Sequence, residues 1–315
     1  MVTAGGIGMG ERRGAGAGQI AAFALMALIW GLTWLPTKLG SEVVPPIFLA
    51  ATRFVLAGLA YGAIALARKV PLTVTQWGRV LVASLLINTG CYSLLFWGVA
   101  RAPSGLSAIV NLALMPICII LVGALYGQER ITKRRLGAIA LVIGGLVLLF
   151  SGRTSSPQEG IQAVIGLCAV AAATLSYAWG TVVSRPLMQT MHPLSLAFWE
   201  TALGALGLVA VSLLVEGFEP ARFAALTDSR AVLSLAILVL GGSLAGFTIY
   251  LWLVRDWGAF RAGLYAFISP IVAVAVGVAL ADEPFGWPEA IGMAVMFTAT
   301  ALALTEGKWG RQGAA

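Results

Sequence analysis

Two ionisable side chains lie inside long apolar stretches of the sequence, where a charge is costly and is usually kept for a function. Arg53 follows Pro45 by eight residues and Glu200 follows Pro193 by seven. At 1.5 Å per helical residue, Arg53 would lie about 12 Å into its stretch. The two can form one ion pair, or each can have separate partners. Direct contact of Arg53 with a substrate is one possible role.

Glu200 is also the one clear titratable carboxylate for proton-coupled chemistry inside these stretches. If an arginine neutralised it permanently, movement of a solute down its own gradient would be the simpler mechanism. Both modes of coupling stay open.

Polar side chains in the same stretches could bind a small ligand. Asn88 and Tyr92 are four residues apart and share one helix face. An amide and a phenol there could bind a carboxylate or ammonium group, or could bond to a neighbouring helix. Lys38 could hold a substrate carboxylate at the mouth of a pathway or extend to lipid headgroups.

Aromatic side chains deep in the stretches could form flat walls around an aromatic or bulky apolar substrate, although core packing explains each of them equally well. With the polar candidates, they complete the predicted substrate-binding set: Trp30, Trp34, Lys38, Asn88, Tyr92, Asn111, Tyr177, Trp179, Tyr250 and Tyr265.

Two prolines, Pro116 and Pro270, lie near the centres of apolar stretches. Proline removes a backbone hydrogen bond and bends or breaks a helix. Interrupted helices at equivalent places in two halves of a chain indicate a transport site. We therefore predict that both prolines are gating or structural residues, with ordinary packing kinks as the alternative.

The chain lacks the residue sets of common enzymes. Its single histidine, His192, lies in a predicted loop, and there is no HExxH, GxSxG or P-loop motif. We predict no catalytic residue, no metal site and no cofactor. An intramembrane enzyme acting on a lipid-linked substrate is kept as the alternative function, and a channel or receptor is a third one.

The elements that position these residues are membrane helices. Residues of the types AVILMFWYC make up 59% of the chain and charged residues only 10%, with a mean hydropathy of +0.93. A helix needs about 20 apolar residues to cross the hydrocarbon core. The sequence has ten such stretches: 19–39, 46–67, 77–98, 104–126, 135–151, 163–185, 193–215, 231–254, 260–281 and 288–306.

The basic residues predict the orientation. With both termini in the cytoplasm, 14 of the 20 Lys and Arg residues lie on the cytoplasmic side and five outside, with Arg53 within a span. This distribution explains the net charge of +7 without a nucleic-acid partner. Three cysteines within apolar stretches give no disulfide framework.

The two halves of the chain repeat each other. Trp30 corresponds to Trp179, 149 residues later, and Pro116 corresponds to Pro270, 154 residues later. Glu129 and Glu283 also match, at helix ends where we expect them to pair with nearby Arg or Lys or to form a gate. Because each half has five spans, the second half must enter the membrane from the opposite side. Inverted repeats are typical of secondary transporters, although a duplicated structural bundle would show the same pattern.

Several short motifs, each occurring in order, resemble the EamA family of the drug/metabolite transporter superfamily. They are Ile29-Trp30-Gly31-Leu32-Thr33-Trp34, Lys38, Pro45 or Pro46, Thr52-Arg53-Phe54, Pro116, Glu129, Gly137 and Gly144-Gly145, followed by Pro270, Asp282-Glu283-Pro284 and Gly292. Within that superfamily the sequence is most similar to YddG-type exporters of aromatic amino acids. An arginine at the position of Arg53 is part of the family's repeat, and the resemblance therefore implies a structural or gating role for Arg53 and Glu200 rather than direct contact with a substrate.

The resemblance implies an all-α membrane protein with ten transmembrane helices, built as two inverted five-helix repeats around a central cavity. The expected parts are a disordered tail (1–18), a first repeat (19–151), a linker (152–162), a second repeat (163–306) and a C-terminal tail (307–315). The implied function is export of aromatic or neutral amino acids, or of another metabolite or drug, by alternating access. The expected partners are the small-molecule substrate and the lipid bilayer of a bacterial inner membrane, with the protein acting as a monomer.

Overall fold

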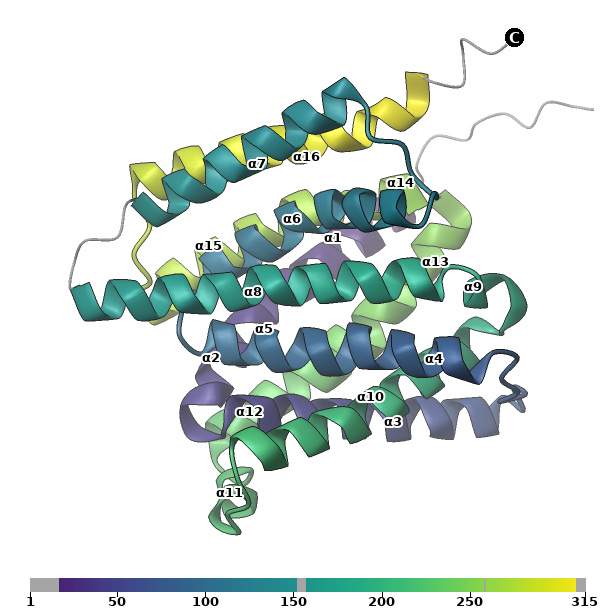
Figure 1. Cartoon of the computed structure of the whole chain (residues 1–315). Helices are drawn as coiled ribbons and strands as arrows, with labels where there is room; N and C mark the ends of the chain where they lie inside the picture. The colour runs from purple at the N-terminus through teal and green to yellow at the C-terminus, as the bar shows by residue number, and fades with distance from the viewer. Residues whose placement is uncertain (1–16, 152–156, 258, 310–315) are drawn as a thin grey trace, which may run out of the picture.

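The structure is a computed structural model that describes residues 17–151, 157–257 and 259–309. The described residues form helices and connecting loops and contain no strand (Figure 1). This confirms the predicted all-α fold. The predicted tails fall largely on residues 1–16 and 310–315, outside the described residues. Of the predicted linker, residues 152–156 lie outside the described residues, and residues 157–162 belong to helix α8.

The helices follow the apolar stretches closely. In chain order they are α1 (Ala17–Leu32), α2 (Trp34–Val43), α3 (Pro46–Ala67), α4 (Trp77–Ser84), η1 (Leu85–Gly90), α5 (Cys91–Val99), α6 (Ser104–Leu125), α7 (Lys133–Ser151), α8 (Pro157–Ser184), α9 (Leu187–Thr190), α10 (Pro193–Val215), α11 (Ala221–Ala225), α12 (Ser229–Ala236), η2 (Ile237–Gly246), α13 (Phe247–Trp257), α14 (Ala259–Ala262), α15 (Tyr265–Ala281) and α16 (Trp287–Trp309).

Seven helical segments of the described chain are long and apolar enough to cross a membrane, and α15 is a shorter apolar helix of 17 residues. Large apolar side chains cover the outside, such as Leu59, Leu206 and Leu214, which are 67%, 66% and 85% exposed. This exterior suits lipid and identifies an integral membrane protein. Crossing of the membrane by α7, α15 and α16 stays a prediction.

Both α6 and α15 continue as helices through Pro116 and Pro270, so neither proline itself interrupts its helix, contrary to the sequence-based expectation. The ninth apolar stretch is nevertheless broken before Pro270, at residues 263–264 between α14 and α15. The first apolar segment also breaks, at Thr33 between α1 and α2. The third and eighth segments contain the π-helical turns η1 and η2, and such turns are frequent at functional sites.

Equivalent helices of the two halves pack against each other. The contacting pairs are α3 with α10, α6 with α15, and α7 with α16, the last of which lie side by side at one edge of the bundle (Figure 1). The pair α3 and α10 is antiparallel: Glu216, just after α10, accepts hydrogen bonds from the backbone of Ile47 and Phe48 at the start of α3. Phe198 near the start of α10 lies against Gly62 near the end of α3.

Candidate substrate-binding site

Arg53 on α3 is buried in contact with the second half of the chain, with 8% of its surface exposed. Its Nε donates a hydrogen bond of 3.3 Å to Oγ of Ser243 on η2. The guanidinium carbon lies 5.1 Å from the ring centroid of Phe54 and 5.4 Å from that of Tyr92, within cation–π range. No carboxylate among the described residues forms an ion pair with Arg53.

Glu200 on α10 has different partners, so the alternative of a direct Arg53–Glu200 pair is wrong for this structure. Its carboxylate accepts a hydrogen bond of 2.6 Å from Ser184 Oγ at the end of α8. Its backbone carbonyl accepts one of 2.8 Å from the amide of Asn88. The predicted ligand Asn88 is therefore bonded to a neighbouring helix, and its Cβ lies against Gly204 of the same helix.

Three of the predicted aromatic residues, Trp30, Tyr250 and Tyr265, pack against one another. The ring centroid of Trp30 lies 4.4 Å from that of Tyr265 and 5.4 Å from that of Tyr250, and the two tyrosines are 6.0 Å apart. Tyr177 on α8 lies in the same region as Tyr92, Tyr250 and Tyr265, and Tyr92 contacts Arg53. All four tyrosines remain partly exposed. We call Arg53, Tyr92, Tyr177, Trp30, Tyr250 and Tyr265 the aromatic cluster.

The π-helical turns help to build this site because they leave backbone carbonyls for side chains to use. On η2, the carbonyl of Gly242 accepts a 3.0 Å hydrogen bond from Trp30 Nε1. The next carbonyl, of Ser243, accepts one from the Tyr61 hydroxyl. Side chains from α1 and α3 are thereby fixed to the second half of the chain. Sequence reasoning missed Tyr61 and Gly242, although Tyr61 follows Arg53 by two helical turns and lies on nearly the same face.

Three predicted site residues lie elsewhere. Trp34 is buried among apolar side chains such as Leu106 and Ile109. Asn111 donates a 2.9 Å hydrogen bond to Thr174 Oγ1 between α6 and α8. Trp179 was expected deep beside a cavity, but 40% of its surface is exposed and its ring nitrogen bonds to the Tyr126 hydroxyl. A substrate-binding role for these residues has no support from their surroundings.

Lys38 belongs to a charged cluster at one end of the bundle. Its Nζ lies 3.0 Å from the carboxylate of Glu283, which is just after α15. The same carboxylate accepts backbone hydrogen bonds of 2.7 Å and 3.1 Å from Ser104 and Gly105, the first residues of α6. We call Lys38, Glu283, Ser104 and Gly105 the Glu283 cluster. An adjoining pocket, lined by residues including Pro103 and Val278, has a volume of about 10 Å³, which is roughly the space of one water molecule.

The charges of the Glu283 cluster set the protonation of its carboxyl group. Burial favours the neutral acid, but the hydrogen bonds from Ser104 and Gly105 and the positive charge of Lys38 outweigh it. The pKa of Glu283 is therefore lowered from its ordinary value of 4.5, and the group is a carboxylate at neutral pH.

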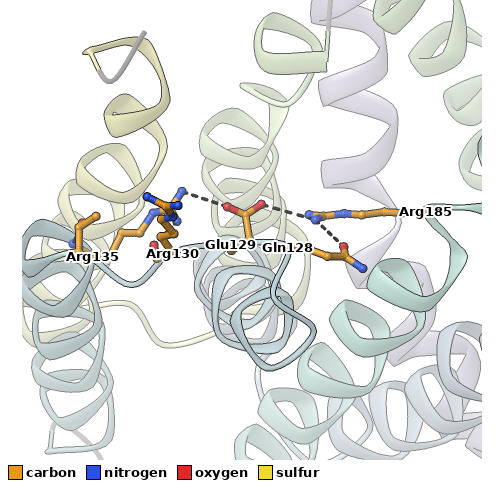
Figure 2. A network of polar contacts seen from close by, with 6 residues as sticks. Gln128, Glu129, Arg130, Arg135 and Arg185 are labelled. Atoms are coloured by element: carbon orange, nitrogen blue, oxygen red, sulfur yellow. Dashed lines mark hydrogen bonds and ion pairs between the residues drawn. The ribbon is translucent and has the colours of Figure 1, made fainter. Parts of the chain in front are cut away.

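A second charged cluster lies around Glu129, in the loop after α6 (Figure 2). The Glu129 carboxylate lies 3.5 Å from Arg185, after α8, and 3.2 Å from Arg135 on α7. Arg185 also donates a 2.9 Å hydrogen bond to the side chain of Gln128. Both matching carboxylates, Glu129 and Glu283, therefore pair with basic residues, as the sequence predicts. We call these residues the Glu129 cluster.

The family of the chain follows from comparison with known proteins. The model of the EamA-like transporter family matches it twice, over residues 18–151 and again over 164–305. The chain belongs to this family. EamA proteins are transporters, so the alternative of an intramembrane enzyme is set aside.

Individual EamA relatives carry names that agree with this assignment. The chain is 29% identical over 295 residues to an uncharacterized inner membrane transporter, YedA, of Escherichia coli K12, covering 92% of this chain and 90% of the relative. It is 28% identical over 264 residues to a probable amino-acid metabolite efflux pump of Salmonella typhimurium LT2, covering 82% and 85%. A crystal structure 22% identical in sequence matches with a TM-score of 0.60 over 92% of this chain and 97% of its own, which supports the fold alone.

The two EamA repeats share both charged clusters. Lys38 of the first repeat pairs with Glu283 of the second, while Arg185 of the second repeat pairs with Glu129 of the first. Each cluster therefore ties one repeat to the other at one end of the bundle.

Proposed function

We propose that this EamA protein is a secondary transporter that exports small metabolites, with aromatic or neutral amino acids as the best candidates. The observation that carries the proposal is the aromatic cluster. It joins Trp30, Arg53 and Tyr92 of the first repeat to Tyr177, Tyr250 and Tyr265 of the second. A site between two repeats can open to either side when one repeat moves against the other.

The helix contacts support an inverted arrangement of ten membrane helices. A two-fold relation requires that each contact between the repeats be matched by its reciprocal. The pairs α1 with α15 and α6 with α8 are such a reciprocal set, as are α3 with η2 and α10 with η1. The antiparallel packing of α3 and α10 has the direction that an inverted repeat demands.

The distribution of basic residues supports a bacterial inner membrane location with both termini in the cytoplasm. In this orientation the Glu129 cluster, close to Arg130, Lys133 and Arg134, lies at the cytoplasmic end, and the Glu283 cluster lies at the outer end. The names of the relatives support the same membrane and an export function.

Transport by the purified protein in liposomes tests the proposal. Vesicles would be loaded with radiolabelled phenylalanine, tryptophan, threonine, lysine or glutamate, and efflux would be followed with and without a pH gradient. We expect saturable efflux of the aromatic and neutral amino acids above that of protein-free vesicles. Efflux indistinguishable from protein-free vesicles for all five would contradict amino-acid export and favour another metabolite or drug.

Glu200 is the residue with which to decide the mode of coupling. We propose proton antiport through Glu200, because this carboxyl lies within a span with a hydroxyl rather than a basic residue as its hydrogen-bond donor. Glu200→Gln should then abolish the response of efflux to a pH gradient. If the variant and the unaltered protein respond to the gradient alike, Glu200 is not the coupling group.

A further inference from the structure

We infer that Arg53 binds the carboxylate of the transported molecule, so that the site accepts aromatic and other apolar carboxylates and rejects amines of the same shape. This inference deepens the transport function proposed above and rests on it. It assigns to Arg53 a direct contact with substrate in addition to its bond between α3 and η2.

The first argument is charge. A guanidinium that is buried without an anion loses several kcal/mol of hydration, by rough continuum reasoning. Arg53 is 8% exposed and is not paired with any carboxylate of the described residues. Glu200 lies on α10, the helix equivalent to α3, and its carboxylate accepts a hydrogen bond from Ser184 instead. The charge of Arg53 therefore has no protein counter-ion, and a bound anion would supply one.

The second argument is the way the guanidinium is held. Nε is bonded to Ser243, and the faces of the group lie near the rings of Phe54 and Tyr92. Neither Nη1 nor Nη2 has a hydrogen-bond acceptor in the described part of the chain. Nη2 lies close to Gly242, where a Cβ would be only 3.3 Å away, so the glycine lets η2 approach the guanidinium without a side chain in contact with it. Two parallel N–H groups of an arginine match the two oxygens of a carboxylate.

The third argument is what surrounds the charge. Tyr92 contacts Arg53, and Tyr177 lies in the same region as Tyr92, Tyr250 and Tyr265. Trp30 packs against Tyr250 and Tyr265. These rings offer apolar faces, and aromatic pairs favour offset or edge-to-face contact. An arginine edge beside a group of aromatic rings fits a molecule with a carboxylate at one end and an apolar body at the other.

A purely structural role for Arg53 would give different kinetics. If Arg53 only linked α3 to η2, its loss would impair transport of every substrate to a similar degree. If it binds a carboxylate, its loss should raise KM for carboxylates alone, because an interaction with the bound ligand is removed.

The test compares three molecules that share a benzene ring: phenylalanine, 3-phenylpropionate and phenethylamine, of which only the last lacks a carboxylate. Efflux of labelled phenylalanine from liposomes, and its inhibition by the other two, would be measured for the unaltered protein, Arg53→Gln and Arg53→Lys. Arg230→Gln is the matched control, because Arg230 is 58% exposed and pairs with Glu42 at the surface. Melting temperatures in detergent would establish that each variant is folded.

For Arg53→Gln we expect KM for phenylalanine and the inhibition constant of 3-phenylpropionate to rise roughly ten- to hundred-fold, the value of a hydrogen-bonded charge. The inhibition constant of phenethylamine should stay the same or fall. Arg53→Lys keeps the positive charge but cannot form two parallel hydrogen bonds to a carboxylate. Its KM for phenylalanine and its inhibition constant for 3-phenylpropionate should therefore lie between those of the unaltered protein and Arg53→Gln. If Arg53→Gln does not fold, the ratio of the two inhibition constants in Arg53→Lys decides the matter alone.

An unchanged KM for phenylalanine in a folded Arg53→Gln protein would overturn the inference while leaving amino-acid transport intact. Equal loss for the carboxylates and the amine would overturn it as well. If the unaltered protein shows no saturable efflux of phenylalanine, the proposed transport function fails first, and the role of Arg53 fails with it.

Discussion

The Glu283 and Glu129 clusters are built on equivalent residues of the two repeats, but the two carboxylates bind different groups. Glu129 and Glu283 are 154 residues apart, and so are Gly123 and Gly277, whose carbonyls accept the backbone N–H of these glutamates. Glu283 has a side chain that is 5% exposed and bonds to Lys38 and to two backbone N–H groups at the start of α6. Glu129 is 26% exposed and bonds to two arginines.

Glu283 binds the start of α6, so the repeat relation would place Glu129 at the start of α15. The two helix starts differ, and this explains the difference. In the first repeat, α6 begins at Ser104, twelve residues before Pro116, and presents its N–H groups to Glu283. In the second repeat, α15 begins at Tyr265, only five residues before Pro270, after the separate short helix α14. The positive end of a helix stabilises a carboxylate, and α15 gives Glu129 no such end in this conformation. The Glu283 carboxylate is therefore the more firmly held of the two, and the Glu129 carboxylate is held by side chains alone.

The largest expected effect is on stability when each carboxylate is removed. Glu283→Ala leaves Lys38 and two helix N–H groups without their acceptor and should lower the free energy of unfolding by about 3 kcal/mol. Glu129→Ala removes partly exposed ion pairs and should cost under about 1 kcal/mol. Unfolding of both variants by SDS from mixed micelles measures the difference. Equal losses would mean that the two ends are equivalent in solution.

The glycines beneath the two carboxylates offer a second comparison. A Cβ at residue 277 would overlap the Glu283 carboxylate and approach Ser104, and these groups are fixed by several hydrogen bonds. We expect Gly277→Ala to cost about 2 kcal/mol, as overpacking commonly does. At residue 123 the overlapping atom is Cγ of Glu129, which has room to move outward, so Gly123→Ala should cost under about 1 kcal/mol. The melting temperatures of the pair give the order, and a reversed order would show that Glu129 is the more rigid of the two.

A pair of double-mutant cycles would measure the ion pairs themselves. For Lys38→Met combined with Glu283→Gln we expect a coupling of about 1.5 kcal/mol, since the carboxylate is buried. For Arg185→Met combined with Glu129→Gln the expected value is about 0.5 kcal/mol. The cycles use the same unfolding titrations. A coupling near zero between Lys38 and Glu283 would mean that only the N–H groups at the start of α6 contribute to the stability that Glu283 provides.

The smallest expected effect is a dependence on acid. Because the pKa of Glu283 is lowered in the folded protein from 4.5, its contribution to stability is complete above about pH 4.5 and is lost as the pH falls through the lowered value. Lys38→Met should move this loss to higher pH, because one of the charges that lowers the pKa is gone. Melting temperatures between about pH 3 and pH 6 would show the shift. If the melting temperatures of the variant and of the unaltered protein fall over the same pH range, Lys38 does not lower the pKa of Glu283.

Much of the fold could be predicted because it depends on composition and repetition. Long apolar stretches predict helices in lipid, since no other local structure satisfies the backbone there. The matching positions of Glu129 and Glu283 predicted that both carboxylates pair with basic residues, and the recurring motifs led to the EamA family. The roles of single site residues were less predictable. Trp30 and Trp179 occupy equivalent positions, yet Trp30 bonds to the π-helical turn η2 and Trp179 faces outward.

The sequence by itself determined that this chain is a helical membrane protein made of two EamA repeats, because hydrophobicity and internal repetition are properties of the chain alone. Only the tertiary structure decided which equivalent residues differ in role. A hydrogen bond needs its partner within about 3 Å, and the partners of Arg53, Glu200 and Lys38 come from helices more than a hundred residues away or from the end of an adjoining one. The break at Thr33 and the turns η1 and η2 set those approaches, and no proline or charge in the sequence marks them.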